Sequence, residues 1–292
     1  MATQQLDTAP DNSSDAAFRL WGEPISLALA AVGLVKVTGL GEIDWDTVVR
    51  GEMAGFEIWR TDDSPLTTWY FRIEYGGDSG GIAEPFVNIQ CATGVDGSGN
   101  LTGSQISASF NLQSPNTGAT SRTSYISGDS GRLVMALFTG NSGSMGFSFE
   151  RSRDANGDET DDEVALQAWS DGAQNRQYRS AQTIHKTDGP IFPKNGPTSS
   201  PLVWSGIYPP LDGGATTGVS GLNQGLYPLH PWRGPVGAPS TNLVMYFDAD
   251  IPELSQITHS ELYGQSHTYL ALGGTNLLIA SSPVFTAMMR YD

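Results

Sequence analysis

The stretch at residues 146–169, GFSFERSRDANGDETDDEVALQAW, predicts a β-hairpin and decides the fold class. Side chains along a strand alternate between its two faces, so Phe147 and Phe149 share a face. Val164 and Leu166 share a face of the return run in the same way. The connecting residues 154–163 (DANGDETDDE) are rich in residue types that favour turns. Two half-apolar strands joined by a polar turn are typical of an antiparallel sheet.

Other stretches repeat this alternation. Residues 69–75 (WYFRIEY) place four large side chains on one face, and residues 105–112 (QISASFNL) place Ile106, Ala108, Phe110 and Leu112 on one face. Residues 133–138 (LVMALF) are apolar on both faces, which predicts a central buried strand. Between these strands the sequence predicts a polar loop over 113–131. We therefore expect a mainly β protein, an antiparallel β-sandwich or a pair of barrel-like sheets.

One helix is predicted, within residues 14–34. Ser13 or Ser14 is suited to cap it, and Pro24 is expected to kink or split it. The residues before it are expected to be disordered or extended. The helix either covers a sheet or docks on another subunit. Its apolar stripe, with spacings of three and four, consists of Phe18, Trp21, Ile25, Leu29 and Val32.

A Pro/Gly-rich arm follows the strands. Ten of the 17 prolines lie between positions 190 and 239, and proline cannot donate to a central ladder. Aromatic residues in this arm indicate contacts with its own domain, a neighbouring subunit or a glycan, and the candidates are Trp204, Tyr208 and Trp232. We divide the chain into an N-terminal arm and helix (1–40), a sandwich-like domain (41–182) and an arm with a C-terminal β segment (183–292).

The charge balance argues against polyanionic partners. The formal net charge is −16, and only three of the 15 basic residues are lysine. Binding to phosphate backbones needs clustered positive charge, so we expect neither nucleic-acid binding nor membrane insertion. The single cysteine, Cys91, excludes an internal disulfide and is expected to be a buried hydrophobe. The polar start of the chain favours synthesis and assembly in the cytoplasm.

No catalytic constellation is predicted. Residues 77–81 spell GDSGG, as in the nucleophile segment of chymotrypsin-type proteases, but all four histidines follow this segment. A second GDSG at 128–131 shows how readily this Gly/Ser-rich chain produces the string. The first is therefore interpreted as a loop tip between two strands, and we expect that the protein is not an enzyme.

No metal site or cofactor is predicted either. Asp154, Asn156 and Asp158 match the start of a calcium loop, but Glu159 and Ala165 stand where a glycine and a bidentate acid are needed. Six acids in 154–163 leave a weak cation site as the alternative to a solvated turn. His259 and His267 are eight apart, which is not the spacing common in zinc sites, and are interpreted as surface or interface residues.

Several stretches resemble virion structural proteins of tailed bacteriophages. The opening ATQQLDTAPDNSSDAAFRLWG, IDWDTVVR and AGFEIWR are similar to the start of small tail-associated proteins. The hairpin FSFERSRDANGDETDDEV resembles their recurring "ERxxDxxG…T" turn, and HTYLALGG resembles their closing strand. The resemblance implies a virion component without active-site residues, in the tail tip, baseplate or a fibre. It also implies a symmetric homo-oligomer that contacts other virion proteins.

Two alternatives remain open from the sequence. A capsid-attached decoration or head-fibre protein would share all of these features. A carbohydrate-binding module would bind a host-surface glycan through exposed aromatic side chains such as Trp204 and Trp232.

Overall fold

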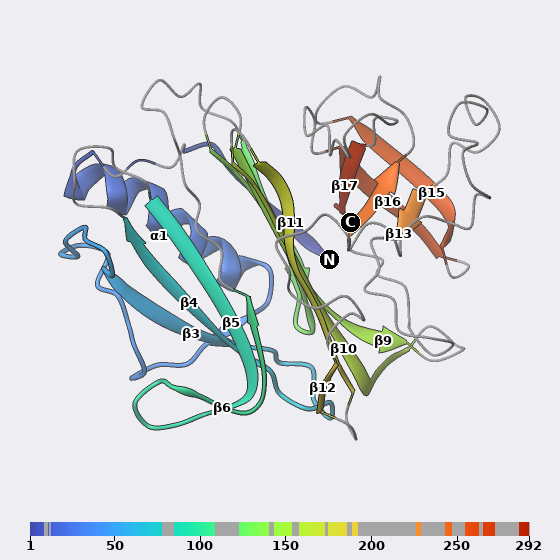
Figure 1. Cartoon of the computed structure of the whole chain (residues 1–292), viewed down its shortest axis with the longest axis horizontal. Helices are drawn as coiled ribbons and strands as arrows, with labels where there is room; N and C mark the ends of the chain where they lie inside the picture. The colour runs from blue at the N-terminus through green and yellow to red at the C-terminus, as the bar shows by residue number, and fades with distance from the viewer. Residues whose placement is uncertain are drawn as a thin grey trace.

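The structure is a computed structural model of the whole chain. It describes residues 1–8, 11, 13–77, 85–108, 123–139, 143–153, 158–172, 175–185, 189–191, 226–228, 243–246, 255–262, 265–271 and 286–291. Within these ranges the chain is mainly β, with three antiparallel sheets and a single helix near the N-terminus (Figure 1). The predicted fold class is therefore confirmed, while residues 192–225 and 229–242, which include most of the predicted Pro/Gly-rich arm, lie outside the described residues.

Helix α1 (Asp15–Ala31) begins at Ser14, whose side chain accepts a hydrogen bond from the Ala17 amide. Its predicted apolar stripe is buried, from Phe18 to Val32. Gly33 follows with φ of +104°, the left-handed conformation in which helices commonly end. A Cβ at Gly33 would lie 3.1 Å from the Ser130 backbone nitrogen, so glycine also lets the helix end close to that turn.

One five-stranded sheet, here called sheet B, lies beside α1. Its order is β2-β3-β4-β5-β6, and all its strand pairs are antiparallel. The strands are β2 (Val35–Lys36), β3 (Gly55–Arg60), β4 (Tyr70–Gly77), β5 (Pro85–Val95) and β6 (Leu101–Ala108). Cys91 is fully buried in β5 together with Val87 and Ile89, as predicted.

The seven-stranded sheet A contains the predicted hairpin. Strands β9 (Gly143–Arg153) and β10 (Glu159–Gly172) pair antiparallel, with Phe149 opposite Leu166. The order is β1-β7-β8-β9-β10-β11-β12. The other strands are β1 (Ala2–Leu6), β7 (Ser124–Asp129), β8 (Arg132–Thr139), β11 (Asn175–His185) and β12 (Gly189–Ile191).

The third sheet, sheet C, packs on the opposite face of sheet A from sheet B (Figure 1). Its strands, in spatial order, are β13 (Leu226–Pro228), β14 (Leu243–Tyr246), β17 (Thr286–Arg290), β16 (Gln265–Ala271) and β15 (Gln256–Leu262). The rings of Tyr125 and Tyr291 are 6.5 Å apart, and the Thr3 hydroxyl donates to the Tyr291 carbonyl at 2.6 Å. These contacts join sheet C to β1 and β7 of sheet A.

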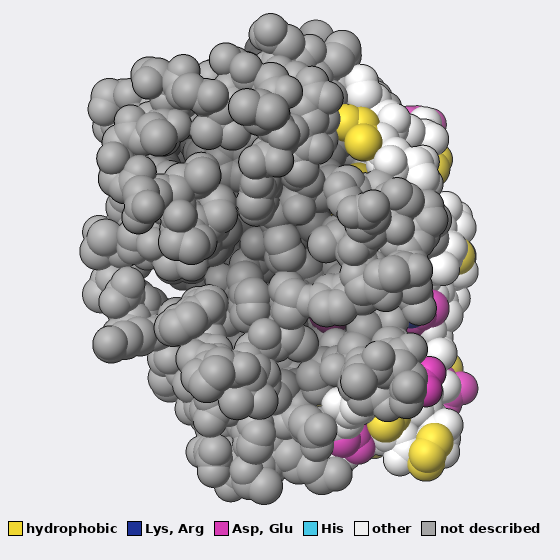
Figure 2. Space-filling view, turned by 90° about the vertical axis from the view of Figure 1, so that its right-hand side faces the viewer, with side chains coloured by type: hydrophobic (Ala, Val, Ile, Leu, Met, Phe, Trp, Pro, Cys, Tyr) yellow, Lys and Arg dark blue, Asp and Glu magenta, His cyan; other side chains and the backbone are white. Residues whose placement is uncertain are grey.

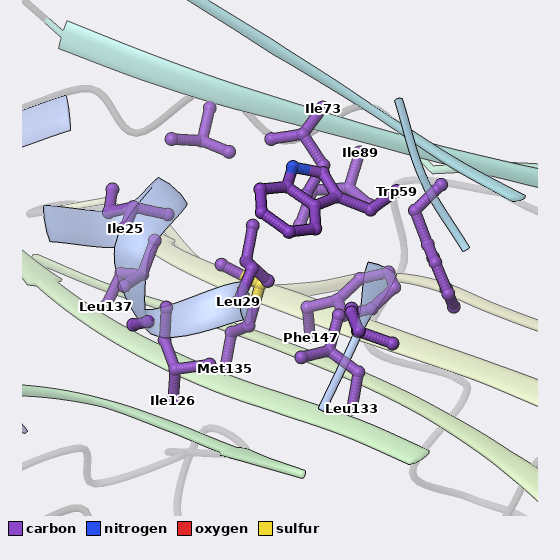
Figure 3. Close-up of a cluster of buried hydrophobic side chains, with 14 of the residues drawn as sticks. Ile25, Leu29, Trp59, Ile73, Ile89, Ile126, Leu133, Met135, Leu137 and Phe147 are labelled. Atoms are coloured by element: carbon purple, nitrogen blue, oxygen red, sulfur yellow. The ribbon is translucent and has the colours of Figure 1, made fainter. Parts of the chain in front are cut away.

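The main core lies between sheets A and B and is completed by α1 (Figure 3). Ile25 and Leu29 of the helix meet Trp59 of sheet B and Met135 of sheet A. Aromatic rings then connect the two sheets directly. The ring of Phe149 lies 4.9 Å from that of Phe71 and 5.7 Å from that of Trp69. The hairpin that decides the fold therefore supplies one wall of the core.

Strand β8 confirms the predicted central strand. Leu133, Met135 and Leu137 face the main core, while Val134 and Ala136 are equally buried on the other face. The alternation predicted at 69–75 is also confirmed, since Trp69, Phe71, Ile73 and Tyr75 are all buried. Among the described residues, no helix combines the length and the apolarity needed to span a bilayer.

One local prediction is wrong, and two others are resolved in part. Helix α1 runs through Pro24 without a break, so of the two predicted effects of this proline, a kink or a split, the split is excluded. Proline removes the hydrogen bond to the carbonyl of Leu20, and that turn lies on the exposed side of the helix, where water can replace it. The predicted loop over 113–131 contains strand β7, which is buried between β1 and β8 although it is rich in Ser and Gly. The opening residues were predicted to be disordered or extended, and Ala2–Leu6 are indeed extended, as strand β1.

Candidate functional site

The outer face of α1 is the candidate contact surface. A helix that lies on a core normally carries polar side chains on its opposite side. In α1 that side bears Leu20 and Leu27, with exposed fractions of 65% and 63%, together with exposed Ala16 and Ala30. Glu23 is the only charged residue among them. The helix is therefore apolar on two faces, and only one of them enters the core.

The connection between β2 and β3 extends this surface. The Arg19 guanidinium donates to the Val48 carbonyl at 2.8 Å, and the Arg50 amide donates to the Asp15 carboxylate at 3.1 Å. These bonds hold residues 48–50 beside the first turns of α1. Val49, between them, is 63% exposed. A second apolar side chain of this connection, Met53, is 52% exposed.

A buried carboxylate fixes α1 against sheet B. Glu57 is fully buried and accepts five hydrogen bonds from three parts of the fold. Its Oε1 accepts from Ser26 of α1 at 2.8 Å, Lys36 of β2 at 2.9 Å and the Trp45 indole at 3.2 Å, and its Oε2 accepts from Trp59 at 3.0 Å and Tyr75 at 3.2 Å. Burying a charge is costly unless it is paired and hydrogen-bonded. Here Lys36 pairs the charge, and the four neutral donors satisfy the remaining hydrogen bonds of the carboxylate.

Trp45 completes this arrangement. Its ring meets that of Tyr75 edge-on at 5.0 Å and lies 6.0 Å from the ring of Phe18. A Cβ at Gly22 would collide with the Trp45 ring, so only glycine leaves room for it on the helix. The helix is thus held rigidly, and its outer face is presented in one orientation.

A second buried network joins sheets A and B. The side chain of Arg151 in β9 is fully buried, and its Nε and Nη2 bind the two carboxylate oxygens of Asp63 at 2.5 and 3.0 Å. Its Nη1 binds Asp161 at 3.0 Å, and its Nη2 also donates to the Thr67 carbonyl at 2.6 Å. Asp161 in turn accepts from the Thr67 amide. The hairpin is therefore clamped to the β3–β4 connection.

This network corrects the interpretation of residues 154–163 as a solvated turn. Glu159 pairs with Arg132 at 2.7 Å, and Asp161 pairs with Arg151. Their side chains are only 18% and 15% exposed, so these two acids belong to the ion-pair network. The signal was present in the strand alternation, because Arg151 follows Phe147 and Phe149 on the inward face. Residues 154–157 of the calcium-like loop lie outside the described residues.

Of the remaining candidates from the sequence, the structure describes one and leaves the others outside the described residues. The second GDSG string is the β7–β8 turn, in which the Gly131 amide donates to the Asp129 carboxylate at 3.1 Å. That string is therefore a structural turn in the fold. The first string begins at Gly77, the last residue of β4, and residues 78–81 lie outside the described residues. The three aromatic candidates of the arm, Trp204, Tyr208 and Trp232, also lie outside them.

Figure 2 shows one further face of the molecule. Its coloured side chains lie along one margin, where acidic groups are scattered among polar and apolar ones. Basic side chains form no patch among the described residues seen in this view.

Burial perturbs two groups of sheet B. Desolvation raises the pKa of the Cys91 thiol, and desolvation together with the nearby Glu57 raises the pKa of Tyr75 well above its usual value. Both groups are fully buried and neutral in the folded chain. Their effect on stability is therefore confined to alkaline pH.

We expect the free energy of unfolding to fall as the pH rises above about 8.5, where an unfolded cysteine ionises. The raised pKa keeps Cys91 protonated in the folded state, so the unfolded state binds fewer protons and gains stability. By pH 9.5 the loss is about 1.4 kcal/mol. Urea unfolding between pH 7.5 and 9.5 measures it. Cys91→Ala should lower stability at both pH values and remove most of this slope, with a small remainder from Tyr75. An unchanged slope would contradict the assignment.

Comparisons with family models, with curated proteins and with solved structures find no match to this chain.

Proposed function

We propose that this chain is a structural subunit of a tailed-bacteriophage particle, in the tail tip, baseplate or a fibre, which works through contacts between subunits and not through catalysis. The observation that carries the proposal is the exposed apolar outer face of α1. The opening segment, residues 43–60 and the hairpin, which resemble phage structural proteins, also form α1, its neighbouring connection and the core wall. Contiguous exposed apolar surface marks interaction sites in soluble proteins.

The spacing on this face favours α1 of a second copy as the partner. Ala16, Leu20, Glu23, Leu27 and Ala30 follow one another at alternating steps of four and three residues. That is the spacing by which two helices pack along a seam, with each apolar side chain inserted between residues of the facing helix. A single polar residue in such a seam, here Glu23, restricts the register of the pair. Most soluble homo-oligomers have closed symmetry, and a self-complementary surface of this kind fits a twofold pair.

Charge placed on the helix face should dissociate the oligomer. We expect native mass spectrometry of the wild-type chain above micromolar concentration to show multiples of 31.1 kDa. The variant Leu20→Lys with Leu27→Lys should give the monomer mass, because it would bury like charges at the seam. The matched control, Thr38→Lys with Ser98→Lys, changes two exposed positions elsewhere and should keep the oligomer. A wild-type monomer would contradict the subunit contact.

The location in the particle needs a separate measurement. A labelled antibody against the purified chain should decorate one end of the tail, seen by negative-stain electron microscopy of intact particles. Labelling of the head would contradict the tail assignment and would indicate a decoration or head-fibre protein instead. If particles carry no label at all, the structural-subunit proposal is wrong even if the purified chain is oligomeric.

A further inference from the structure

The exposed side chains along the outer face of α1 follow the same order in both directions of the helix. They are Ala16, Leu20, Glu23, Leu27 and Ala30, so the series of residue types is unchanged when it is reversed. A twofold axis that crosses the helix near Glu23 places Leu20 of one copy opposite Leu27 of a second copy. The same axis pairs Ala16 with Ala30. A twofold contact uses one patch on both subunits and needs this self-complementarity, so the face fits a second copy in antiparallel orientation.

The two ends of this face differ in the size of their side chains. Two hydrogen bonds hold residues 48–50 beside the first turns of α1, and Val49 adds a branched, 63% exposed side chain there. The other end exposes only small residues, Ala30, Ala31 and Gly33. An antiparallel pair sets Val49 of each copy against the small residues of the other. A parallel pair would set Val49 against Val49 and leave a gap between the small residues, which forfeits packing contacts.

Charge at the two ends favours the same orientation. A helix carries partial positive charge at its N-terminal end and partial negative charge at its C-terminal end. The last turn of α1 has no basic residue, whereas Arg50 lies beside the first turns with its side chain 34% exposed. In an antiparallel pair Arg50 of one copy lies on the side of the negative helix end of the other. A parallel pair places ends of like sign together. The two Glu23 carboxylates meet in both orientations and do not distinguish them.

We propose that two copies of the chain pair their α1 helices in antiparallel orientation, about a twofold axis near Glu23, with Leu20 of each copy packed on Leu27 of the other. This inference rests on the proposed function, because it takes the contact between the α1 helices from there and adds its orientation. A twofold contact is closed after two copies. The α1 face therefore joins chains in pairs, and any larger assembly uses other surfaces.

Disulfide trapping tests the orientation. Opposite positions of two packed helices come within the Cα separation of about 4.4–6.8 Å that a disulfide needs. In the antiparallel pair the two Leu20 positions are about 10 Å apart along the helix. Full-length Leu20→Cys and Leu27→Cys chains are purified separately, one of them labelled with heavy nitrogen, and are mixed under reducing conditions before mild oxidation. We expect mass spectrometry to show the mixed disulfide, and little product from either chain alone.

Control variants separate the orientation from the contact itself. Glu23→Cys lies at the axis and should crosslink to itself in either orientation, whereas Ser98→Cys, in an exposed turn elsewhere, should not. The native Cys91 is fully buried and takes no part. A Glu23→Cys disulfide without the mixed disulfide would overturn the antiparallel orientation and leave the proposed contact standing. Absence of both disulfides would overturn the contact between the α1 helices, and this inference with it.

Discussion

Replacing Glu57 with glutamine is expected to lower the free energy of unfolding by about 3 kcal/mol, because it disrupts a buried hub with five donors. An amide nitrogen must take the place of one carboxylate oxygen. On the Oε1 side it would face the Lys36 ammonium and the Trp45 indole, neither of which can accept a hydrogen bond. On the Oε2 side it would face the Trp59 indole. Either orientation also leaves Lys36 without its anion.

Thermal unfolding followed by circular dichroism measures this effect. Each kcal/mol of lost unfolding free energy lowers the midpoint temperature of unfolding by roughly 2–4 °C. The matched control is Glu52→Gln, at an exposed position of the connection between β2 and β3, where a change within about 0.5 kcal/mol is expected. Equal midpoints for Glu57→Gln and Glu52→Gln would show that the buried carboxylate does not hold the helix on the sheet.

The sequence predicted the apolar walls of the core well, because alternation is a local property. Phe147 and Phe149, and the four aromatic and aliphatic side chains of 69–75, lie inward as their period requires. The helix stripe from Phe18 to Val32 is buried for the same reason. Each of these predictions needed only the residues of one element.

Glu57 and Arg151 were missed although the same alternation places them inward. Glu57 shares a strand face with Trp59, and Arg151 shares one with Phe149. A charged residue at an inward position normally argues against burial, since its desolvation must be offset by partners. Those partners come from distant parts of the chain, such as Ser26 for Glu57 and Asp63 for Arg151. Sequence periodicity contains no information on such pairs.

Strand β7 was missed for a related reason. Among residues 124–129 only Tyr125 and Ile126 favour a strand, and β1 and β8 complete that strand by pairing with it on both sides. The apolar outer face of α1 could have been found, because Leu20 and Leu27 already lie opposite the predicted stripe.

Arg151→Met is expected to cost about 3–5 kcal/mol, the range found when one partner of a buried ion pair is removed. Methionine keeps much of the apolar stem but leaves the carboxylates of Asp63 and Asp161 without their cation, with side chains only 10% and 15% exposed. The Thr67 carbonyl loses a donor as well. Because Asp63 lies in the β3–β4 connection, the contact between sheets A and B should loosen first. The lost free energy should appear as a lower urea concentration at the midpoint of unfolding for this variant.

A surface pair provides the matched control for this prediction. Arg60 binds Asp62 at 2.7 Å, but Asp62 is 55% exposed, so Arg60→Met should cost less than about 1 kcal/mol. Neutralising the stranded acids tests the cause directly. Adding Asp63→Asn and Asp161→Asn to Arg151→Met removes the uncompensated charges, and a well-packed neutral replacement of a buried ion pair is often tolerated. The triple variant should therefore recover part of the lost stability. A triple variant less stable than Arg151→Met alone would show that the cost comes from lost packing and hydrogen bonds, and not from unpaired charge.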